Sequence, residues 1–379
     1  MAESPRSDVG SPAAARLLAA LGGVQDPELR RPITELGMVG SVSVDDDGAA
    51  RVAILLTISG CPLRGTIVDD VTAAATAVEG VASVAVDVGV MTPEQRSELK
   101  AGLKKRTAPF TEPGSLTRIV AVASGKGGVG KSSLTVNLAC AMAADGLRVG
   151  IIDADVHGFS VPGLMGITQA PTRVDELILP PVAHGVKVIS IGMFVDGNQP
   201  VVWRGPMLHR ALEQFLTDVH FGDLDVLLLD LPPGTGDIAI SVSQLLPGSG
   251  LLVVTTPQSA AAEVAERAGA VAKQTGQEVL GVVENMSWMD LPDGGRMEPF
   301  GSGGGELLAA RLSKTLGVDV GLLGRIPLDP RLREGGDSGR PVVLAAPESA
   351  VSLEIRRIAR TLSRRPRGLA GRSLGVTPA

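Results

Sequence analysis

The chain has no tyrosine, two tryptophans and six phenylalanines, so aromatic residues make up only 2% of its 379 residues. Proteins that bind single-stranded nucleic acid usually stack the bases on aromatic side chains, and this scarcity argues against such a surface. With 35 basic and 41 acidic residues the net charge is -6, so no overall positive field attracts nucleic acid. We therefore expect no nucleic-acid partner and a core built from aliphatic side chains.

Cysteine is equally scarce, because Cys61 and Cys140 are the only two in the sequence. Two cysteines do not make a disulfide framework, and their number fits a reducing compartment. The opening residues, MAESPRSDVGSP, are polar and lack the apolar stretch of a signal peptide. No apolar run approaches the roughly 20 residues that a membrane helix needs. The sequence thus predicts a cytoplasmic protein without a membrane partner.

A glycine-rich segment, SGKGGVGKSS, follows the apolar run RIVAVA and extends from Ser124 to Ser133. It fits the phosphate-binding pattern G-x-x-x-x-G-K-[ST], in which backbone N–H groups and the start of a helix surround phosphate oxygens. Lys131 is expected to reach the β- and γ-phosphates, and the Ser132 hydroxyl to bind Mg²⁺. The residues expected to contact the nucleotide here are Gly125, Lys126, Gly127, Gly128, Val129, Gly130, Lys131, Ser132 and Ser133. Lys126 is an extra charge that the ordinary pattern does not contain.

A small α+β domain is predicted before this loop. We expect a disordered N-terminus at residues 1–12 and a compact unit at 13–91, with a hairpin whose turn is DDDG and a helix from about 63 to 78. We interpret residues 92–114 as a linker. It holds a basic cluster that either faces solvent or contacts phosphate or a partner, formed by Lys100, Lys104, Lys105 and Arg106.

Residues 115–364 show a different pattern, in which apolar runs alternate with helical stretches. The runs are RIVAVAS, RVGIIDAD, VKVISIGM, DVLLLDLP, LLVVTTP, VLGVVENM and LGRIPLD. Near-continuous runs of this kind are typical of strands buried on both faces of a mostly parallel sheet. The predicted fold class is therefore α/β, a mostly parallel P-loop NTPase domain preceded by the small α+β domain. Residues 365–379 are expected to form a basic, disordered tail.

Four segments at strand ends complete the expected site, because open α/β sheets bind ligands at the carboxyl ends of their strands. In DADVHGFS, Asp155 is expected to order the water that attacks the γ-phosphate and Asp153 to support the Mg²⁺ shell, unless the segment is only an Asp-rich turn. In LLLDLPPGTGD, Asp230 is expected to bind Mg²⁺ through water, and the Gly234 amide to sense the γ-phosphate.

The other two segments concern the base. Asn285, in ENMS, offers a donor and an acceptor that match the N6/N7 edge of adenine, or else it caps a turn. In RIPLDPRLRE the prolines, Pro327 among them, stiffen a loop that is expected to lie against the base.

These motifs together resemble the Mrp/ApbC family of iron–sulfur cluster carrier ATPases, within the deviant-Walker-A group that includes the nitrogenase iron protein and the Min/Par ATPases. The likeness rests on KGGVGKS, DADVHGFS, WRGPM, LDLPPGTGD, ENMS, FGSGGG and IPLDPRLREGGDSG, which span most of residues 118–341. DPEL and GCP in the N-terminal unit resemble a SufT-type domain. The resemblance implies a homodimer with ATP at its interface, Lys126 reaching the partner's nucleotide, slow ATP hydrolysis, and apo iron–sulfur proteins and assembly factors as partners.

The sequence departs from this family at one point. The family usually carries a C-x-x-C pair shortly after NMS, and two such pairs would hold a bridging cluster. Here the stretch is WMDLPDGGRMEPFGSGGG, which contains no cysteine. Cys140 is expected to be a buried small hydrophobe. Cys61 precedes a helix whose N-terminus would stabilise a thiolate, so it is either a thiol for an iron–sulfur cluster or another metal, or a packing residue.

Two functions follow as hypotheses. The first is an ATP-hydrolysing carrier that binds iron–sulfur clusters and transfers them to apoproteins. The second is a ParA/MinD-like switch that dimerises with ATP and acts in positioning at a membrane or nucleoid. The second depends on a C-terminal helix whose apolar residues recur at helical spacing, namely Val351, Ile355, Ile358 and Leu362, and on the basic tail. Ordinary packing of that helix on the sheet is the alternative.

Overall fold

The computed structural model describes residues 12–58, 61, 63–104, 115–155, 158–175, 177–194, 205–234, 237–258 and 271–363. The chain forms two compact units, Met1–Ser115 with Ile167–Leu224 and Leu116–Gly166 with Asp225–Ala379. The expected N-terminal disorder and the basic tail lie outside the described residues, except that Pro12 already opens the first helix. The predicted domain boundaries, including one domain over 115–364, stay predictions.

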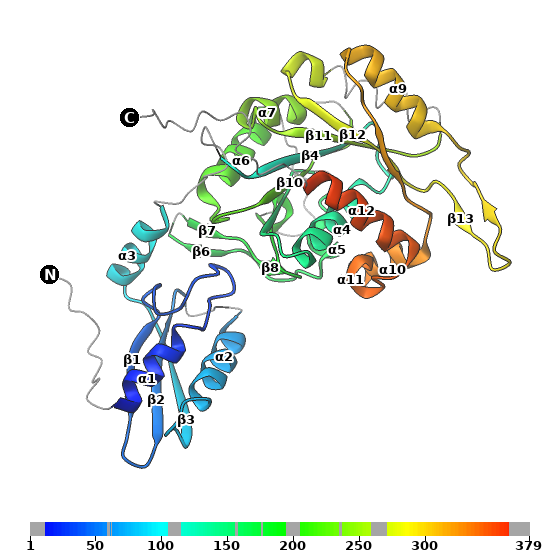
Figure 1. Ribbon diagram of the computed structural model, residues 1–379. Helices are drawn as coiled ribbons and strands as arrows, with labels where there is room; N and C mark the ends of the chain where they lie inside the picture. The colour runs from blue at the N-terminus through cyan, green and yellow to red at the C-terminus, as the bar shows by residue number, and fades with distance from the viewer. Residues whose placement is uncertain are drawn as a thin grey trace, which may run out of the picture. The chain divides into compact units, whose positions relative to one another are not determined.

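The N-terminal α+β part contains a three-stranded sheet, β1-β2-β3, with β1 and β2 antiparallel and β2 and β3 parallel (Figure 1). Its elements are α1 (Pro12–Leu21), β1 (Val39–Val44), β2 (Ala49–Leu56), α2 (Arg64–Thr76), β3 (Ser83–Val90) and α3 (Pro93–Lys104). Asp45 Oδ1 accepts the amides of Asp47 and Ala49 at 3.1 and 2.7 Å, and Gly48 takes the left-handed φ of 78°. This turn chemistry confirms the hairpin predicted at DDDG.

Helix α3 lies within the range that we interpreted as a linker. It begins with a capping box, because the Gln95 amide donates to Thr92 Oγ1 at 3.3 Å and the Thr92 amide donates to Gln95 Oε1 at 2.8 Å. Pro93 at the first helical position suits this start as well. The signal T-P-E-Q was present in the sequence, so this helix could have been predicted, and the interpretation of residues 92–114 as a linker stays a prediction.

The main sheet has eight strands in the order β15-β12-β11-β4-β10-β5-β9-β8. They are β4 (Arg118–Ser124), β5 (Val149–Asp153), β8 (Val182–Ala183), β9 (Val186–Ser190), β10 (Val226–Asp230), β11 (Gly250–Thr255), β12 (Glu278–Glu284) and β15 (Leu322–Arg325). Strands β4, β5, β10, β11, β12 and β15 pair in parallel, and the edge strand β8 is antiparallel to β9. Every residue of β5, β10 and β11 is buried, as the apolar runs predicted. The mostly parallel sheet is confirmed.

Two short antiparallel ribbons accompany the sheet, β6 (Thr172–Val174) with β7 (Leu177–Leu179), and β13 (Met289–Asp290) with β14 (Arg296–Met297). The remaining helices are α4 (Lys131–Ala144), α5 (Val161–Leu164), η1 (Ile191–Phe194), α6 (Gly205–Asp218), α7 (Asp237–Leu245), α9 (Gly304–Leu316), α10 (Pro330–Asp337), α11 (Val342–Ala345) and α12 (Ala350–Ser363). Residues 271–275 are helical as well.

Helix α12 packs against α4 on one face of the main sheet (Figure 1). Its expected apolar stripe is fully used in this packing, because at most 2% of the surface is exposed in each of Val351, Ile355, Ile358 and Leu362. The alternative reading of that stripe, ordinary packing, is therefore the one that the structure bears out. In the described parts of the chain, no helix is both long and apolar enough to cross a membrane.

Candidate nucleotide-binding site

The glycine-rich loop leaves the centre of the main sheet, where β4 ends at Ser124 between β11 and β10. Parallel pairing aligns Asp230 of β10 with Asp153 of β5, so these ends meet at the same edge of the sheet. Helix α4 begins directly after the loop, at Lys131. Gly130 has a φ of 80°, and a Cβ there would lie 2.3 Å from Asn285 Nδ2. Only glycine fits this point, both for its conformation and for the close approach.

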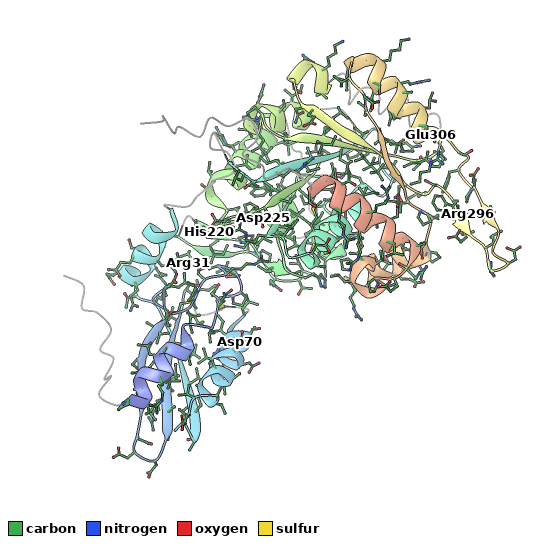
Figure 2. All side chains as sticks on the ribbon, in the orientation of Figure 1. Arg31, Asp70, His220, Asp225, Arg296 and Glu306 are labelled. Atoms are coloured by element: carbon green, nitrogen blue, oxygen red, sulfur yellow. The ribbon has the colours of Figure 1, made fainter. Side chains whose placement is uncertain are left out.

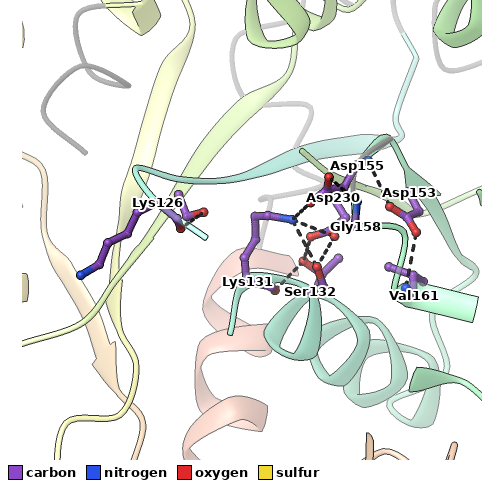
Figure 3. A network of polar contacts seen from close by, with 10 residues as sticks. Lys126, Lys131, Ser132, Asp153, Asp155, Gly158, Val161 and Asp230 are labelled. Carbon is purple, nitrogen blue, oxygen red and sulfur yellow. Dashed lines mark hydrogen bonds and ion pairs between the residues drawn. The ribbon is translucent and has the colours of Figure 1, made fainter. Parts of the chain in front are cut away.

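A compact ionic group stands at the start of α4 (Figure 3). Lys131 Nζ lies 2.8 Å from Asp230 Oδ2, and Ser132 Oγ donates to the same carboxylate oxygen at 2.5 Å. Asp230 is fully buried and only 6% of Lys131 is exposed, so each charge depends on the other for its stabilisation. The structure thus brings together the three residues that the sequence predicted for phosphate and magnesium.

Asp153 is the last residue of strand β5, and Asp155 lies in the loop that follows it. Asp155 Oδ2 lies 3.9 Å from Lys131 Nζ, and its Oδ1 accepts the amide of Gly158 at 3.1 Å. Asp153 is fully buried, and its carboxylate accepts the amides of Asp155 and Val161 at 3.1 and 3.4 Å. Asp155 therefore borders the ionic group, whereas Asp153 shapes the loop that carries Asp155. Their catalytic and metal-binding roles stay predictions.

A cavity of about 380 Å³ opens above the loop. All of its lining residues belong to the loop or to the DADVHGFS and LLLDLPPGTGD segments. They are Ser124, Gly127, Gly128, Val129, Gly130, Lys131, Ser132, Ser133, Asp155, Gly158, Ser160 and Pro233. Backbone amides of the loop and the Lys131 ammonium supply the positive charge that polyphosphate requires. The arrangement is suited to holding phosphate groups.

Lys126 is not part of this lining. Its side chain extends away from Lys131, and its Nζ donates to Gln258 Oε1 at 2.7 Å (Figure 3). Gln258 follows strand β11 and is a contact that sequence reasoning missed, because nothing in a TTPQ segment marks it as a lysine partner. The contact of Thr135 Oγ1 with Asp230 Oδ1 was missed too. Thr135 lies one helical turn after Lys131, and this i, i+4 spacing was a usable signal.

Asn285, Gly234 and Pro327 support the loop and its surroundings. Asn285 Nδ2 donates to the Val129 carbonyl at 2.8 Å with 3% of the residue exposed, and the Gly234 amide donates to the Ser124 carbonyl at 2.8 Å. Pro327 is buried beside the 284–288 segment, to which both of its neighbours donate backbone hydrogen bonds. The Asn285 side chain thus holds the phosphate loop through the Val129 carbonyl. The contact of Asn285 with adenine, the γ-phosphate role of Gly234 and the base contact of Pro327 stay predictions.

The oxygen donors near Lys131 suit a Mg²⁺ ion that is also bound by water and phosphate. They do not suit a metal ion held by protein ligands alone. Among the described residues, no group of three or more His, Cys, Asp or Glu side chains is placed to hold a metal ion by itself. Mg²⁺ commonly takes one or two protein oxygens and completes its shell with water and substrate phosphates. Ser132 Oγ and Asp230 Oδ2 supply such a pair, and the Lys131 ammonium already stabilises negative charge at this point.

Burial raises the pKa of both cysteines and so favours their protonated thiols over thiolates. Burial raises the pKa of Cys140 to about 12, and its side chain is fully buried in α4, which confirms the expected packing role. Burial also raises the pKa of the half-buried Cys61, and Glu28 and Asp26 add to the rise, while the amides of Leu63 and Arg64 lower it less. The amides at the helix start thus favour the thiolate as expected, but burial outweighs them, and the metal or cluster role of Cys61 stays a prediction.

The stretch after Ser287 forms the β13–β14 hairpin instead of a cysteine pair. Arg296 lies over the Trp288 ring at 4.5 Å from its centroid, and its Nε is 3.2 Å from Asp290 Oδ1. The label of Arg296 in Figure 2 marks this hairpin. A cation–π contact and an exposed ion pair hold the hairpin together, and neither supplies a ligand for iron.

A family model described as "NUBPL iron-transfer P-loop NTPase" matches residues 115–363, and one described as "Iron-sulfur cluster assembly protein" matches residues 14–88. An "Iron-sulfur cluster carrier protein" of Mycobacterium tuberculosis is 62% identical over 368 residues, which cover 96% of this chain and 97% of that protein. A protein of the same name from Synechocystis is 42% identical over 355 residues, covering 92% of this chain and 96% of the relative.

A solved structure of a nucleotide-binding protein from Archaeoglobus fulgidus in complex with ADP is 35% identical, with a TM-score of 0.51. It covers 66% of this chain and 92% of the other chain. The similarity to the iron–sulfur carriers extends over almost the whole chain, and the phosphate loop with Lys131, Ser132 and Asp230 has the geometry of a nucleotide site. The chain belongs to the family of NUBPL iron-transfer P-loop NTPases.

Proposed function

We propose that this protein is an ATP-binding and ATP-hydrolysing iron–sulfur cluster carrier that transfers clusters to apoproteins. The observation that carries the nucleotide half is the Lys131–Ser132–Asp230 group at the edge of the phosphate loop. The cargo half is supported by the identity of 62% to a relative named as an iron–sulfur cluster carrier. Apo iron–sulfur proteins and assembly factors are the proposed partners, and the cytoplasm is the proposed location.

The contacts of the charged groups support a separate role for each in hydrolysis. With ATP bound, Lys131 would exchange the Asp230 carboxylate for the β- and γ-phosphates, and Ser132 and Asp230 would hold Mg²⁺, which would neutralise phosphate charge. Asp155, held by the Gly158 amide, orients the attacking water. Because phosphoryl transfer depends mostly on positioning and charge stabilisation, a site with one orienting carboxylate is expected to turn over slowly.

Lys126 is proposed to act on a second copy of the chain. Its side chain points away from Lys131 and its cavity, so it does not contribute charge to the nucleotide of its own subunit in this conformation. Its contact with Gln258 is exposed, and exposed polar pairs contribute little free energy. Lys126 is therefore free to leave Gln258 at low cost when a homodimer forms around ATP.

The cluster is the cargo, and the chain offers few thiols for it. The Cys140 side chain on α4 is fully buried, which leaves Cys61 as the thiol that the solvent can reach. A [4Fe–4S] cluster takes four thiolate ligands, and two copies of Cys61 supply half of them. We propose that Cys61 binds cluster iron together with an external low-molecular-weight thiol, and that iron binding replaces the proton that burial keeps on the sulfur.

Anaerobic reconstitution with iron and sulfide tests the cargo directly. The parent is expected to retain iron and acid-labile sulfide and to pass them to an apo-ferredoxin. Cys61→Ala is expected to lose both, while Cys140→Ala, the matched control, keeps them. If the parent binds no iron and transfers none, the carrier function is refuted, whereas nucleotide binding would be unaffected by that result.

A positioning switch at a membrane lacks comparable support. The apolar face of α12 is used in packing on α4, so this helix has no continuous apolar face left for a bilayer. The basic tail lies outside the described residues. The carrier function also gives the N-terminal domain and Cys61 a role, which the switch does not.

A further inference from the structure

Thr135 stands out among the residues around Asp230 because it is fully buried and does not line the cavity above the phosphate loop. It lies four residues after Lys131 in α4, on the same face of the helix. Its Oγ1 is 2.9 Å from Asp230 Oδ1 and 3.0 Å from the Lys131 carbonyl oxygen. Both neighbours are acceptors, so the single hydroxyl proton is shared between them or donated to the charged one, which binds it more strongly.

The two oxygens of Asp230 therefore face different environments. Oδ1 accepts from Thr135 inside the protein, and Oδ2 meets Ser132 and Lys131 at the edge of the cavity. A carboxylate bound on one oxygen by a rigid helix cannot rotate freely. The hydrogen bond from Thr135 to Oδ1 thus restrains the carboxylate with Oδ2 directed toward the cavity.

We propose that Thr135 is a positioning residue that holds Asp230 in the orientation needed for Mg²⁺. This inference rests on the proposed nucleotide function. When nucleotide draws Lys131 away from Asp230, the carboxylate loses its strongest neighbour, and Thr135 remains as the buried group that keeps its orientation. Thr135 itself touches neither nucleotide nor metal.

A purely structural role would look different. Threonines in helices often donate to the carbonyl four residues earlier, as Thr72 does to Val68 at 2.7 Å in α2. Thr72 has no carboxylate partner among the described contacts, so Thr72→Val removes a helix back-bond alone. Thr135→Val removes the same kind of bond and also the contact with Asp230. The difference between the two variants isolates the Asp230 contact.

The test measures binding of a fluorescent ADP analogue to the full chain, in EDTA and across a magnesium titration. Hydrogen bonds to charged groups are strong enough that Thr135→Val should raise the Mg²⁺ concentration for half-maximal tightening about tenfold. In EDTA, where no metal is bound, the ADP affinity of Thr135→Val should stay within about threefold of the parent, because Thr135 does not touch the nucleotide. Thr135→Ser keeps the hydroxyl and should restore the parental magnesium dependence, and Thr72→Val should show it unchanged.

Electron paramagnetic resonance of bound Mn²⁺ gives a second readout that does not depend on turnover. If Thr135→Val binds Mn²⁺–ADP like the parent, or if Thr135→Ser fails equally, the positioning role is refuted. Should valine prevent folding, Thr135→Ala takes its place with the same expected results. If the parent itself binds no ADP, the proposed nucleotide function is refuted and this inference with it; a parent that binds ADP with an unaffected Thr135→Val refutes the inference alone.

Discussion

Two clusters in this protein bury a lysine with two carboxylates, and they differ in what surrounds them. Lys131 meets Asp230 and Asp155 beside a cavity of about 380 Å³. Lys187, 2% exposed, interacts electrostatically with Asp26 and Glu28, which are 7% and 5% exposed. The second cluster lies within the unit that combines the N-terminal residues with Ile167–Leu224. It borders no comparable polar cavity among the cavities described.

The second cluster shows what burial does without a ligand to bind. Burial lowers the pKa of Lys187 to about 8, and the charge of Arg30 lowers it further against the two carboxylates. Burial raises the pKa of Glu28 to about 7, and the charge of Asp26 raises it further against the Thr172 hydrogen bond and Lys187. Burial raises the pKa of Asp26 as well. For Glu28 and Lys187 the neutral forms are thus close to the charged forms in free energy near pH 7 to 8. The same residue types border the proposed phosphate site in one place and form a buried, pH-sensitive cluster in the other.

Removal of the two lysines should separate these roles most strongly. Lys131→Ala deletes the ammonium that faces the cavity, and we expect at least a hundredfold loss of ATP affinity, because hydrogen bonds and ion pairs to charged groups are worth about 1.5–3 kcal/mol each. Lys187→Met should leave ATP affinity within about threefold of the parent, since its side chain lies outside the nucleotide cavity. Isothermal titration calorimetry measures both. Equal losses in the two variants would show that the clusters are not functionally distinct.

Lys126→Ala should have the next largest effect, on hydrolysis and not on binding. The side chain lies outside the cavity of its own subunit, so ATP affinity should be retained. If Lys126 stabilises charge on the partner's nucleotide, turnover should fall about a hundredfold, the lower range for loss of a single charge donor in a transition state. Gln258→Ala removes its present partner and serves as the control, with turnover near the parental value. Steady-state phosphate release checks both variants, and a parental rate in Lys126→Ala would refute the role.

The sequence predicted the first cluster and not the second, for a physical reason. Gly130, Lys131 and Ser132 are neighbours in the chain, so the phosphate loop is a local pattern, and Asp230 is marked by the end of an apolar strand. Asp26 and Lys187 come from segments more than a hundred residues apart, and only the tertiary fold brings them together. Helix α3 was missed although no physical reason prevented its prediction. Its capping box is a local pattern that could be read from T-P-E-Q.

Glu28→Gln should change how stability depends on pH. In the parent the pKa of Glu28 keeps its proton on the folded state up to about pH 7, whereas the unfolded chain loses it near the ordinary glutamate pKa of 4.5. The folded state therefore binds more protons in that interval, and the free energy of unfolding falls as pH rises through it. The total fall from this group is on the order of 3 kcal/mol. Urea unfolding of the full chain between pH 4.5 and 8 should show a flatter profile in Glu28→Gln.

Two features of the profile check this assignment. Asp26 has a raised pKa too, so Glu28→Gln should keep a residual fall at the acidic end. Lys187 acts in the opposite direction, because its pKa is lowered from 10.5 to about 8, and stability should rise with pH above 8 in both proteins. A Glu28→Gln profile as steep as the parent's between pH 5 and 7 would show that Glu28 is not the titrating group.

Thr172→Val should give the smallest effect and the finest test of the second cluster. Thr172 Oγ1 donates to Glu28 Oε1 at 2.9 Å, and this hydrogen bond lowers the pKa of Glu28 against the larger effect of burial. Loss of the bond should raise the pKa of Glu28 further, so the fall in stability would occur at higher pH than in the parent. The bond also stabilises the folded state, and its loss should cost about 1 kcal/mol above pH 7 and less at acidic pH, where Glu28 is protonated. The double variant Thr172→Val/Glu28→Gln should lack the pH shift, because no titrating group remains at position 28; a shift that persists there would place the effect on Asp26.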